Sequence, residues 1–210
     1  MAVDTKKEQE REEIHRRVWA IADELRGAVD GWDFKNYVLG TMFYRYISEN
    51  LTDYINKGEV EAGNPDFDYA KLSDEEAEEA REGLVQEKGF FILPSELFEN
   101  VRSKASENPN LNETLEKAFN NIEDSARGSD FEDGFVGLFD DFDVNSNKLG
   151  STVAKRNERI VKLLNGRARQ IWRLSCIPYH GLPQMGQRQS YVSPALCIGA
   201  AQSRKSENIS

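Results

Sequence analysis

Three basic residues near the end of an otherwise acidic stretch have a spacing that suits anion binding. Lys155, Arg159 and Lys162 recur at intervals of four and three residues. This spacing places them on one face of a helix that we predict over residues 151–164. The residues expected to face inward on this helix are Val153, Asn157, Ile160, Val161 and Leu164. A row of cations can lie along a phosphate backbone or against an acidic partner. The alternative is an ordinary solvated face, with cations favourably placed near a helix C-terminus.

Catalytic residues are harder to find in this sequence. Asn64-Pro65-Asp66-Phe67 is similar to the Asn-Pro-Pro-aromatic motif with which amino-methyltransferases receive a flipped base. Asp66 replaces the second proline and no apolar strand leads into the motif, so a turn is the better explanation. There is no GxxxxGK[ST] phosphate loop, and the two histidines, His15 and His180, form no catalytic arrangement. We therefore predict no catalytic, cofactor-binding or metal-binding residue.

The run from Asp141 to Asn147 has oxygen-bearing side chains at alternate positions, as calcium-binding loops do. Ser146 stands where such a loop needs glycine, and Thr152 stands where it needs a bidentate glutamate. Asp and Asn are also common in turns, which explains this run without a metal.

The charge of the chain is unevenly distributed. The net charge is −10 over 210 residues, but residues 166–210 contain six basic residues and one acidic residue. The preceding part is therefore strongly acidic and a poor ligand for DNA by itself. No apolar run approaches the ~20 residues needed to cross a bilayer, and the only cysteines, Cys176 and Cys197, form no disulfide framework. We expect a cytoplasmic protein that does not contact membranes.

The predicted fold is built around one helix within residues 26–51. Its apolar residues recur at helical spacing and leave only a narrow polar face. A second helix is predicted over residues 4–26, with Ile14, Val18, Ile21 and Leu25 as its apolar stripe. We expect residues 55–70 to form a surface loop rich in Gly, Asn, Asp and Pro.

Further helices follow in the sequence. Ser73 and Glu76 form a capping-box pattern that opens a helix to about Gln86, and Ser95 is expected to cap a helix over residues 96–104. Another helix is expected over residues 111–122, and aromatic residues within 131–142 share one helical face. Residues 89–93 are the one short β-like run. The predicted fold class is mainly all-α and bundle-like.

Several blocks in this sequence closely resemble a known family. They are IHRRVWAIADELRG, DGWDFKNYVLGTMFYRYISENL, KGFFILPSELFENV, LNETLEKAFNNIE and the stretch from GLFDDFDVNSNKLG to Gly166. The resemblance is to the N-terminal helical domain of HsdM, the modification subunit of type I restriction–modification enzymes. It covers roughly residues 14–166, with the blocks in the family's order.

The resemblance implies a role in a complex. Family subunits transfer a methyl group from S-adenosylmethionine to adenine N6, together with a specificity subunit, a second modification subunit and a restriction subunit. Their N-terminal domain helps to close a clamp around DNA, so this chain is expected to meet DNA only through the complex. The candidate contact residues that match family blocks are Trp32, Lys35, Tyr37, Tyr44 and Arg45; Lys155, Arg159 and Lys162 join them on physical grounds.

The composition changes after Gly166, because residues 167–210 contain no Asp and lose the apolar periodicity. We predict two parts: a helical domain over 4–166, and an irregular, disordered or frameshifted tail that replaces the catalytic domain. By itself the chain is then expected to bind no S-adenosylmethionine and to be inactive. The alternative is a separate acidic helical interaction module that regulates such a complex.

Overall fold

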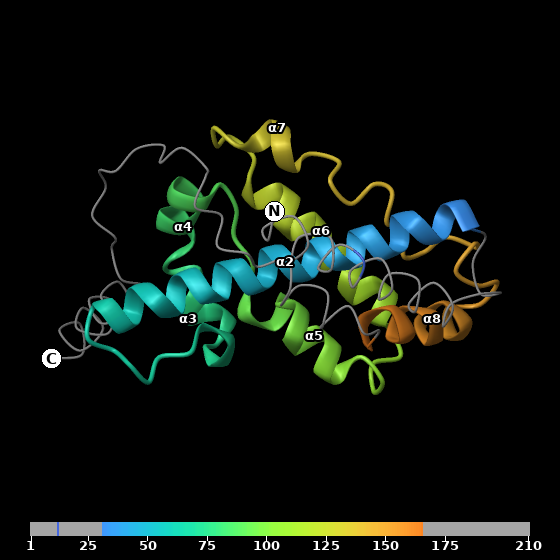
Figure 1. Ribbon diagram of the computed structural model, residues 1–210, viewed down its shortest axis with the longest axis horizontal. Coiled ribbons are helices and arrows are strands. Elements are labelled where there is room, and N and C mark those ends of the chain that lie inside the picture. Colours follow the sequence, from blue (N-terminus) through green and yellow to red (C-terminus); the bar gives the residue numbers. More distant parts are fainter. Residues whose placement is uncertain (1–11, 13–30, 166–210) are drawn as a thin grey trace, which may run out of the picture.

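The computed structural model describes Glu12 and residues 31–165, with side chains from Lys35 onward. The helix α2 (Gly31–Glu61) runs along the whole described domain, and the other helices lie beside it (Figure 1). The described residues form helices and loops without a β-strand, which confirms the predicted mainly α fold. Apart from Glu12, the helix predicted over residues 4–26 lies outside the described residues, as does the predicted tail.

The remaining elements are short compared with α2. In chain order they are η1 (Tyr69–Lys71), α3 (Asp74–Glu78), α4 (Arg81–Lys88), η2 (Pro94–Glu96), α5 (Phe98–Lys104), α6 (Leu111–Ser125), α7 (Glu132–Phe135) and α8 (Val153–Asn165). Both α5 and α8 pack against α2, while α6 packs against α8 and α7. No helix in the described ranges has the length and apolar composition for a membrane crossing.

The central helix is longer than its sequence pattern predicted. The predicted loop over residues 55–70 was wrong at its start, because α2 continues to Glu61. The helix ends where Gly63 adopts a φ of 97°. There the Gly63 N–H donates to the Val60 carbonyl at 3.1 Å and the Asn64 N–H donates to the Glu59 carbonyl at 2.8 Å. These two bonds form a Schellman motif, which satisfies carbonyls that the helix end leaves open.

Two predicted helix starts had different outcomes. The capping box is confirmed, since Ser73 Oγ accepts the Glu76 N–H and Glu76 Oε2 accepts the Ser73 N–H. The helix that it opens breaks after Glu78, however, and resumes as α4. Ser95 caps no helix. Its N–H and hydroxyl both donate to Asp74, at 2.9 Å and 2.6 Å, so it ties the η2 turn to α3.

The β-like run over residues 89–93 forms no strand, because no other strand lies beside it in the described structure. Instead it is a buried connection between α4 and η2. The Phe91 N–H donates to Ser125 Oγ at 2.9 Å, and that hydroxyl lies 3.2 Å from the Phe91 carbonyl. A side chain of α6 thus provides the hydrogen bonds that a neighbouring strand would otherwise supply.

The aromatic segment over residues 131–142 is mostly irregular, contrary to the predicted helical face. Within this segment only α7 is helical, and the positive φ of Gly137, 71°, departs from helical backbone conformation just after it. Phe139 and Phe142 are still buried, and the Phe139 ring stacks on Phe119 at 4.2 Å. Phe131 remains about half exposed. The apolar residues therefore reach the core without a continuous helix.

Glu96 is one of two buried carboxylates among the described residues, the other being Glu59. Glu96 is only 6% exposed; its Oε1 accepts a hydrogen bond from Asn121, whereas its buried Oε2 has no partner among the described residues. Burial raises the pKa of Glu96, and the Asn121 bond and the charges of Lys117 and Arg81 oppose that rise only in part.

This raised pKa predicts a pH-dependent effect of Glu96→Gln. Because the folded state binds the proton more tightly than the unfolded state does, the contribution of Glu96 to stability falls as pH rises above its unfolded pKa of about 4.3. The variant should therefore gain stability relative to the parent chain as pH rises from about 4 through the raised folded-state pKa of Glu96. Urea unfolding across this range measures the difference, and a difference that does not change with pH would contradict the assignment.

Candidate nucleic-acid and partner interface

The orientation of α8 is set by its buried side. Ile160, Leu163 and Leu164 are buried in the core, as is Asn157. Asn157 Oδ1 accepts the N–H of Asn112 at 3.1 Å, and its Nδ2 donates to the Pro109 carbonyl at 2.6 Å. A buried amide with two fixed partners holds the helix in one rotation. The opposite, basic side of α8 consequently faces outward.

One inward position on α8 was predicted wrongly. Val153 is 43% exposed, whereas Asn157, Ile160 and Leu164 are buried as expected and Val161 is half-buried. Val153 is the first residue of the helix, one turn before Asn157 makes the first buried contact. The apolar repeat of a helix can thus continue to its terminal residue even where that residue lies beyond the core.

The three predicted cations on α8 have different environments. Lys155 is exposed, and Lys162 pairs with Glu158 at 2.7 Å while half of its side chain remains accessible. Arg159 is half-buried and donates to the carbonyls of Lys148 and Leu149 at 3.2 Å and 2.8 Å. The two lysines therefore form the outward part of the strip, and the arginine fastens the loop that precedes α8.

The pKa of Glu158 shows how the three cations of this face act on a negative charge. The pKa of Glu158 is lowered, first by the hydrogen bond and charge of Lys162 and then by the charges of Arg159 and Lys155. All three cations thus stabilise a negative charge placed among them. Glu158 in turn neutralises part of the strip.

The candidates on α2 mostly belong to the interior. Tyr44 is fully buried, and Tyr37 is 3% exposed. Arg45 is 7% exposed; its Nε donates to Glu49 at 2.7 Å and its guanidinium lies 5.5 Å from the centre of the Phe98 ring. These three residues have structural contacts in the folded domain and little surface to offer a partner.

The other two candidates on α2 differ from these. Lys35 is exposed. Trp32 lies within α2, but its side chain is outside the described set.

The loop over residues 143–150 connects the two groups of candidates. The Tyr37 hydroxyl donates to the Asp143 carbonyl at 3.1 Å, and Arg159 binds carbonyls at the other end of this loop. Figure 1 shows α8 beside the N-terminal half of α2, so Lys35 and the α8 strip belong to the same end of the domain. The sequence did not reveal this junction. Asn145, whose Oδ1 accepts a hydrogen bond from Asn112 at 2.6 Å, was predicted only as a turn residue.

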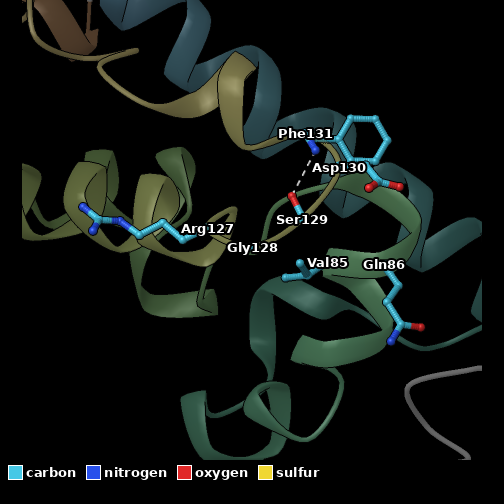
Figure 2. Close-up of a pocket in the computed structure, with 7 residues that line it drawn as sticks. All are labelled: Val85, Gln86, Arg127, Gly128, Ser129, Asp130 and Phe131. Carbon is cyan, nitrogen blue, oxygen red and sulfur yellow. Dashed lines mark hydrogen bonds between the residues drawn. The ribbon is translucent and has the colours of Figure 1, made fainter.

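A separate pocket of about 400 Å³ lies between α4 and the turn after α6 (Figure 2). Val85 and Gln86 line one side, and residues 127–131 line the other. Ser129 Oγ accepts the Phe131 N–H at 3.2 Å, and Arg127 pairs with Asp124 at 2.9 Å. These groups pair no nucleophile with a base. In the described residues, no three His, Cys, Asp or Glu side chains gather as metal ligands either.

Asn64, the first residue of the Asn-Pro-Asp-Phe motif, forms a hydrogen bond within the domain. Its Nδ2 donates to Glu59 Oε2 at 2.7 Å, next to the Schellman motif that ends α2. Phe67 packs against the core. These contacts agree with a turn at residues 64–67 and leave the Asn64 amide engaged within the domain.

Comparison with known proteins gives consistent results. Residues 14–166 match the family described as the HsdM N-terminal domain. A type I restriction enzyme MpnII methylase subunit from Mycoplasma pneumoniae is 46% identical over 169 residues, which cover 77% of this chain and 31% of that subunit. The crystal structure of a type I restriction-modification system methyltransferase subunit from Streptococcus thermophilus superposes with a TM-score of 0.56 at 23% identity, covering 76% of this chain and 36% of that one. The chain thus spans about a third of the length of these relatives.

Proposed function

The chain belongs to the HsdM N-terminal domain family, and on that premise we propose that its domain helps a type I modification complex to close around DNA. The observation that carries this proposal is the basic strip of α8, outward-facing on an otherwise acidic body. Cations along a helix face suit phosphates that follow one another along a strand. Lys35 at the same end of the domain would extend this surface.

The acidity of the domain limits what the strip can do alone. Both the acidic domain and DNA are negatively charged, and their mutual repulsion opposes binding at low ionic strength. Other subunits would therefore supply most of the affinity. The strip would then position the domain on the backbone and read no sequence.

The chemistry proposed for the complex belongs to other parts of it. The complex would transfer a methyl group to adenine N6, with S-adenosylmethionine bound outside residues 31–165. The expected partners are a specificity subunit, a second modification subunit and a restriction subunit. The proposed place of action is the cytoplasm, where the DNA would lie.

The α8 strip can be tested by removing its two outward lysines. In a complex of this chain with its specificity subunit, Lys155→Ala combined with Lys162→Ala should weaken DNA binding. The slope of log K against log salt should also become less steep, by about 1–2, because binding with fewer phosphate contacts releases fewer counterions. Fluorescence anisotropy with a labelled duplex at several salt concentrations measures both quantities.

Lys57→Ala is the control for this measurement; it removes one exposed lysine, whereas the double variant removes two. Lys57 is 79% exposed and lies in the C-terminal half of α2, at the other end of the domain from α8. Its removal changes the net charge without touching the strip, so the salt slope should stay unchanged. Equal effects of the two changes would show general attraction instead of contact by α8.

The proposed membership of a complex has its own test. If the domain is an assembly part of a modification subunit, this chain should bind the specificity subunit and be displaced by the full-length modification subunit. Binding without such competition would instead favour a separate regulatory module, and co-purification of tagged subunits distinguishes the two.

A further inference from the structure

The pocket between α4 and the turn after α6 has a half-exposed aromatic ring at its edge. Phe131 lines this pocket of about 400 Å³ and is 48% exposed (Figure 2). Val85, on the α4 side, is half-buried and packs against the core. The pocket therefore offers apolar surface from both of its walls. Exposed aromatic residues beside a hollow are typical of the contact sites between proteins.

The position of Phe131 is fixed before any partner arrives. The Phe131 N–H donates to Ser129 Oγ at 3.2 Å, and the Gly128 N–H donates to Glu132 Oε2 at 2.9 Å, so the turn is held by its own side chains. A Cβ added to Gly89 would lie 2.5–2.6 Å from three atoms of the Phe131 side chain, which therefore lies against this glycine. A preformed surface of this kind loses little conformational entropy on binding.

The turn side of the pocket is strongly acidic. Residues 123–141 contain seven acidic residues and one basic residue. Asp130, which lines the pocket, and Asp133 are both exposed. The one basic residue is Arg127, which pairs with Asp124 at 2.9 Å and extends away from Asp130 (Figure 2). The carboxylates beside the pocket therefore favour a positively charged occupant.

The α4 side of the pocket has the same sign of charge. Glu82 is exposed and precedes the pocket residue Gln86 by four positions, so both lie on one side of α4. Each cation of α4 lies over an aromatic ring of the domain, at 4.4 Å for Arg81 and 3.5 Å for Lys88. Both sides of the pocket thus combine apolar surface with carboxylates.

We propose that this pocket binds a basic segment of a partner protein. One large apolar side chain of the segment enters between Val85 and Phe131, and neighbouring Lys or Arg side chains face the carboxylates on both sides. The apolar contact supplies most of the affinity, and the charges set the orientation and speed the association. The same carboxylates repel phosphates, so the occupant is a protein segment and not a nucleic acid. This inference does not depend on the proposed contact between α8 and DNA.

Selection from a library of random peptides tests the proposal. The full chain is immobilised and used to select short phage-displayed peptides, with counter-selection against a variant that carries Asp130→Lys and Asp133→Lys. We expect the enriched peptides to combine Lys or Arg with a large apolar residue. Enrichment of acidic or uncharged peptides would overturn the proposal, and so would a selection that enriches nothing beyond what the variant also binds.

The apolar part of the site is tested with a selected peptide. Phe131→Ser should weaken binding by about ten-fold or more in fluorescence anisotropy, as the loss of an aromatic anchor does. Val60→Ser is the matched control, because Val60 is 52% exposed near the end of α2 and does not line the pocket. Equal affinities of the Phe131→Ser variant and the parent chain would overturn the proposal. Circular dichroism checks that both variants retain their helices.

The charges are tested on exposed residues, where substitution leaves the core untouched. Asp130→Lys combined with Asp133→Lys should weaken binding of the same peptide by about ten-fold or more, because attraction becomes repulsion. Glu107→Lys combined with Glu116→Lys changes the net charge equally at exposed positions outside the pocket lining, and it should have a much smaller effect. Equal losses in the two variants would overturn the proposal, because they would show general attraction to an acidic domain.

Discussion

Replacing Tyr44 by alanine should remove about 3–5 kcal/mol from the free energy of unfolding, as large aromatic-to-alanine changes in cores do. The Tyr44 side chain is fully buried in the middle of α2. Its ring meets Phe98 at 5.5 Å and Phe119 at 5.2 Å, both edge-on, and Phe139 at 6.4 Å. The change would therefore open a cavity where α2, α5 and α6 meet. A domain of this size has about 5–15 kcal/mol in total, so urea unfolding should show a large loss.

Tyr44→Phe separates the ring from its hydroxyl. The hydroxyl donates to the Glu96 carbonyl at 2.5 Å, and burial raises the pKa of Tyr44, so the hydroxyl stays protonated as a donor. Losing that donor leaves a buried carbonyl unpaired and should cost about 1–2 kcal/mol. If Tyr44→Ala cost no more than Tyr44→Phe, the ring would contribute little and the described core would be wrong.

The identity of Tyr44 as a core residue shows where sequence reasoning works and where it stops. Helical periodicity correctly identified α2 as the central helix, but it did not fix which of its sides is buried, because Phe43 of the apolar set is exposed and Tyr44 is fully buried. The family resemblance also marked Tyr44 and Arg45 as possible contacts. Their burial depends on Phe98 and Phe119, more than 50 residues away, and one-dimensional spacing does not contain that information.

Local signals succeeded when the interaction itself was local. The Ser73 capping box joins residues three positions apart, and the sequence predicted it correctly. The end of α2 was missed because Gly58 and Gly63 are equally plausible stops by composition. Only Gly63 has the positive φ, and Ile55 and Glu59 are buried before it. Burial of the last two helical turns decided between the glycines.

The candidate surface was predicted in part for the same reason. The spacing of Lys155, Arg159 and Lys162 placed them on one side of α8, but it could not separate the outward lysines from the arginine that binds the 143–150 loop. That distinction arises from the loop folding back on α8, where Lys148 and Leu149 present their carbonyls to Arg159. Asn157 was expected only to face inward, and the structure adds that its amide accepts a hydrogen bond from the Asn112 N–H.

Two helical glycines should respond to alanine with opposite signs. At Gly40 in α2, an added Cβ would lie 2.8–2.9 Å from three atoms of the Phe142 side chain. Gly83 in α4 has nothing within 4 Å of the same position. Alanine gains about 1 kcal/mol over glycine in a helix when space is available. Gly83→Ala should therefore stabilise the chain, by about 0.5–1 kcal/mol.

Gly40→Ala should lose stability in spite of the same helical gain. Phe142 is 3% exposed and is held by Tyr37 at 5.6 Å and Phe119 at 5.2 Å, so its ring has little room to move away. Overpacking of this kind costs about 1–3 kcal/mol. Urea midpoints of the two variants should move in opposite directions from the parent chain. If both variants were more stable than the parent chain, the Phe142 side chain would have to move away easily. The close approach of residues 139–144 to α2 would then not explain the glycine at position 40.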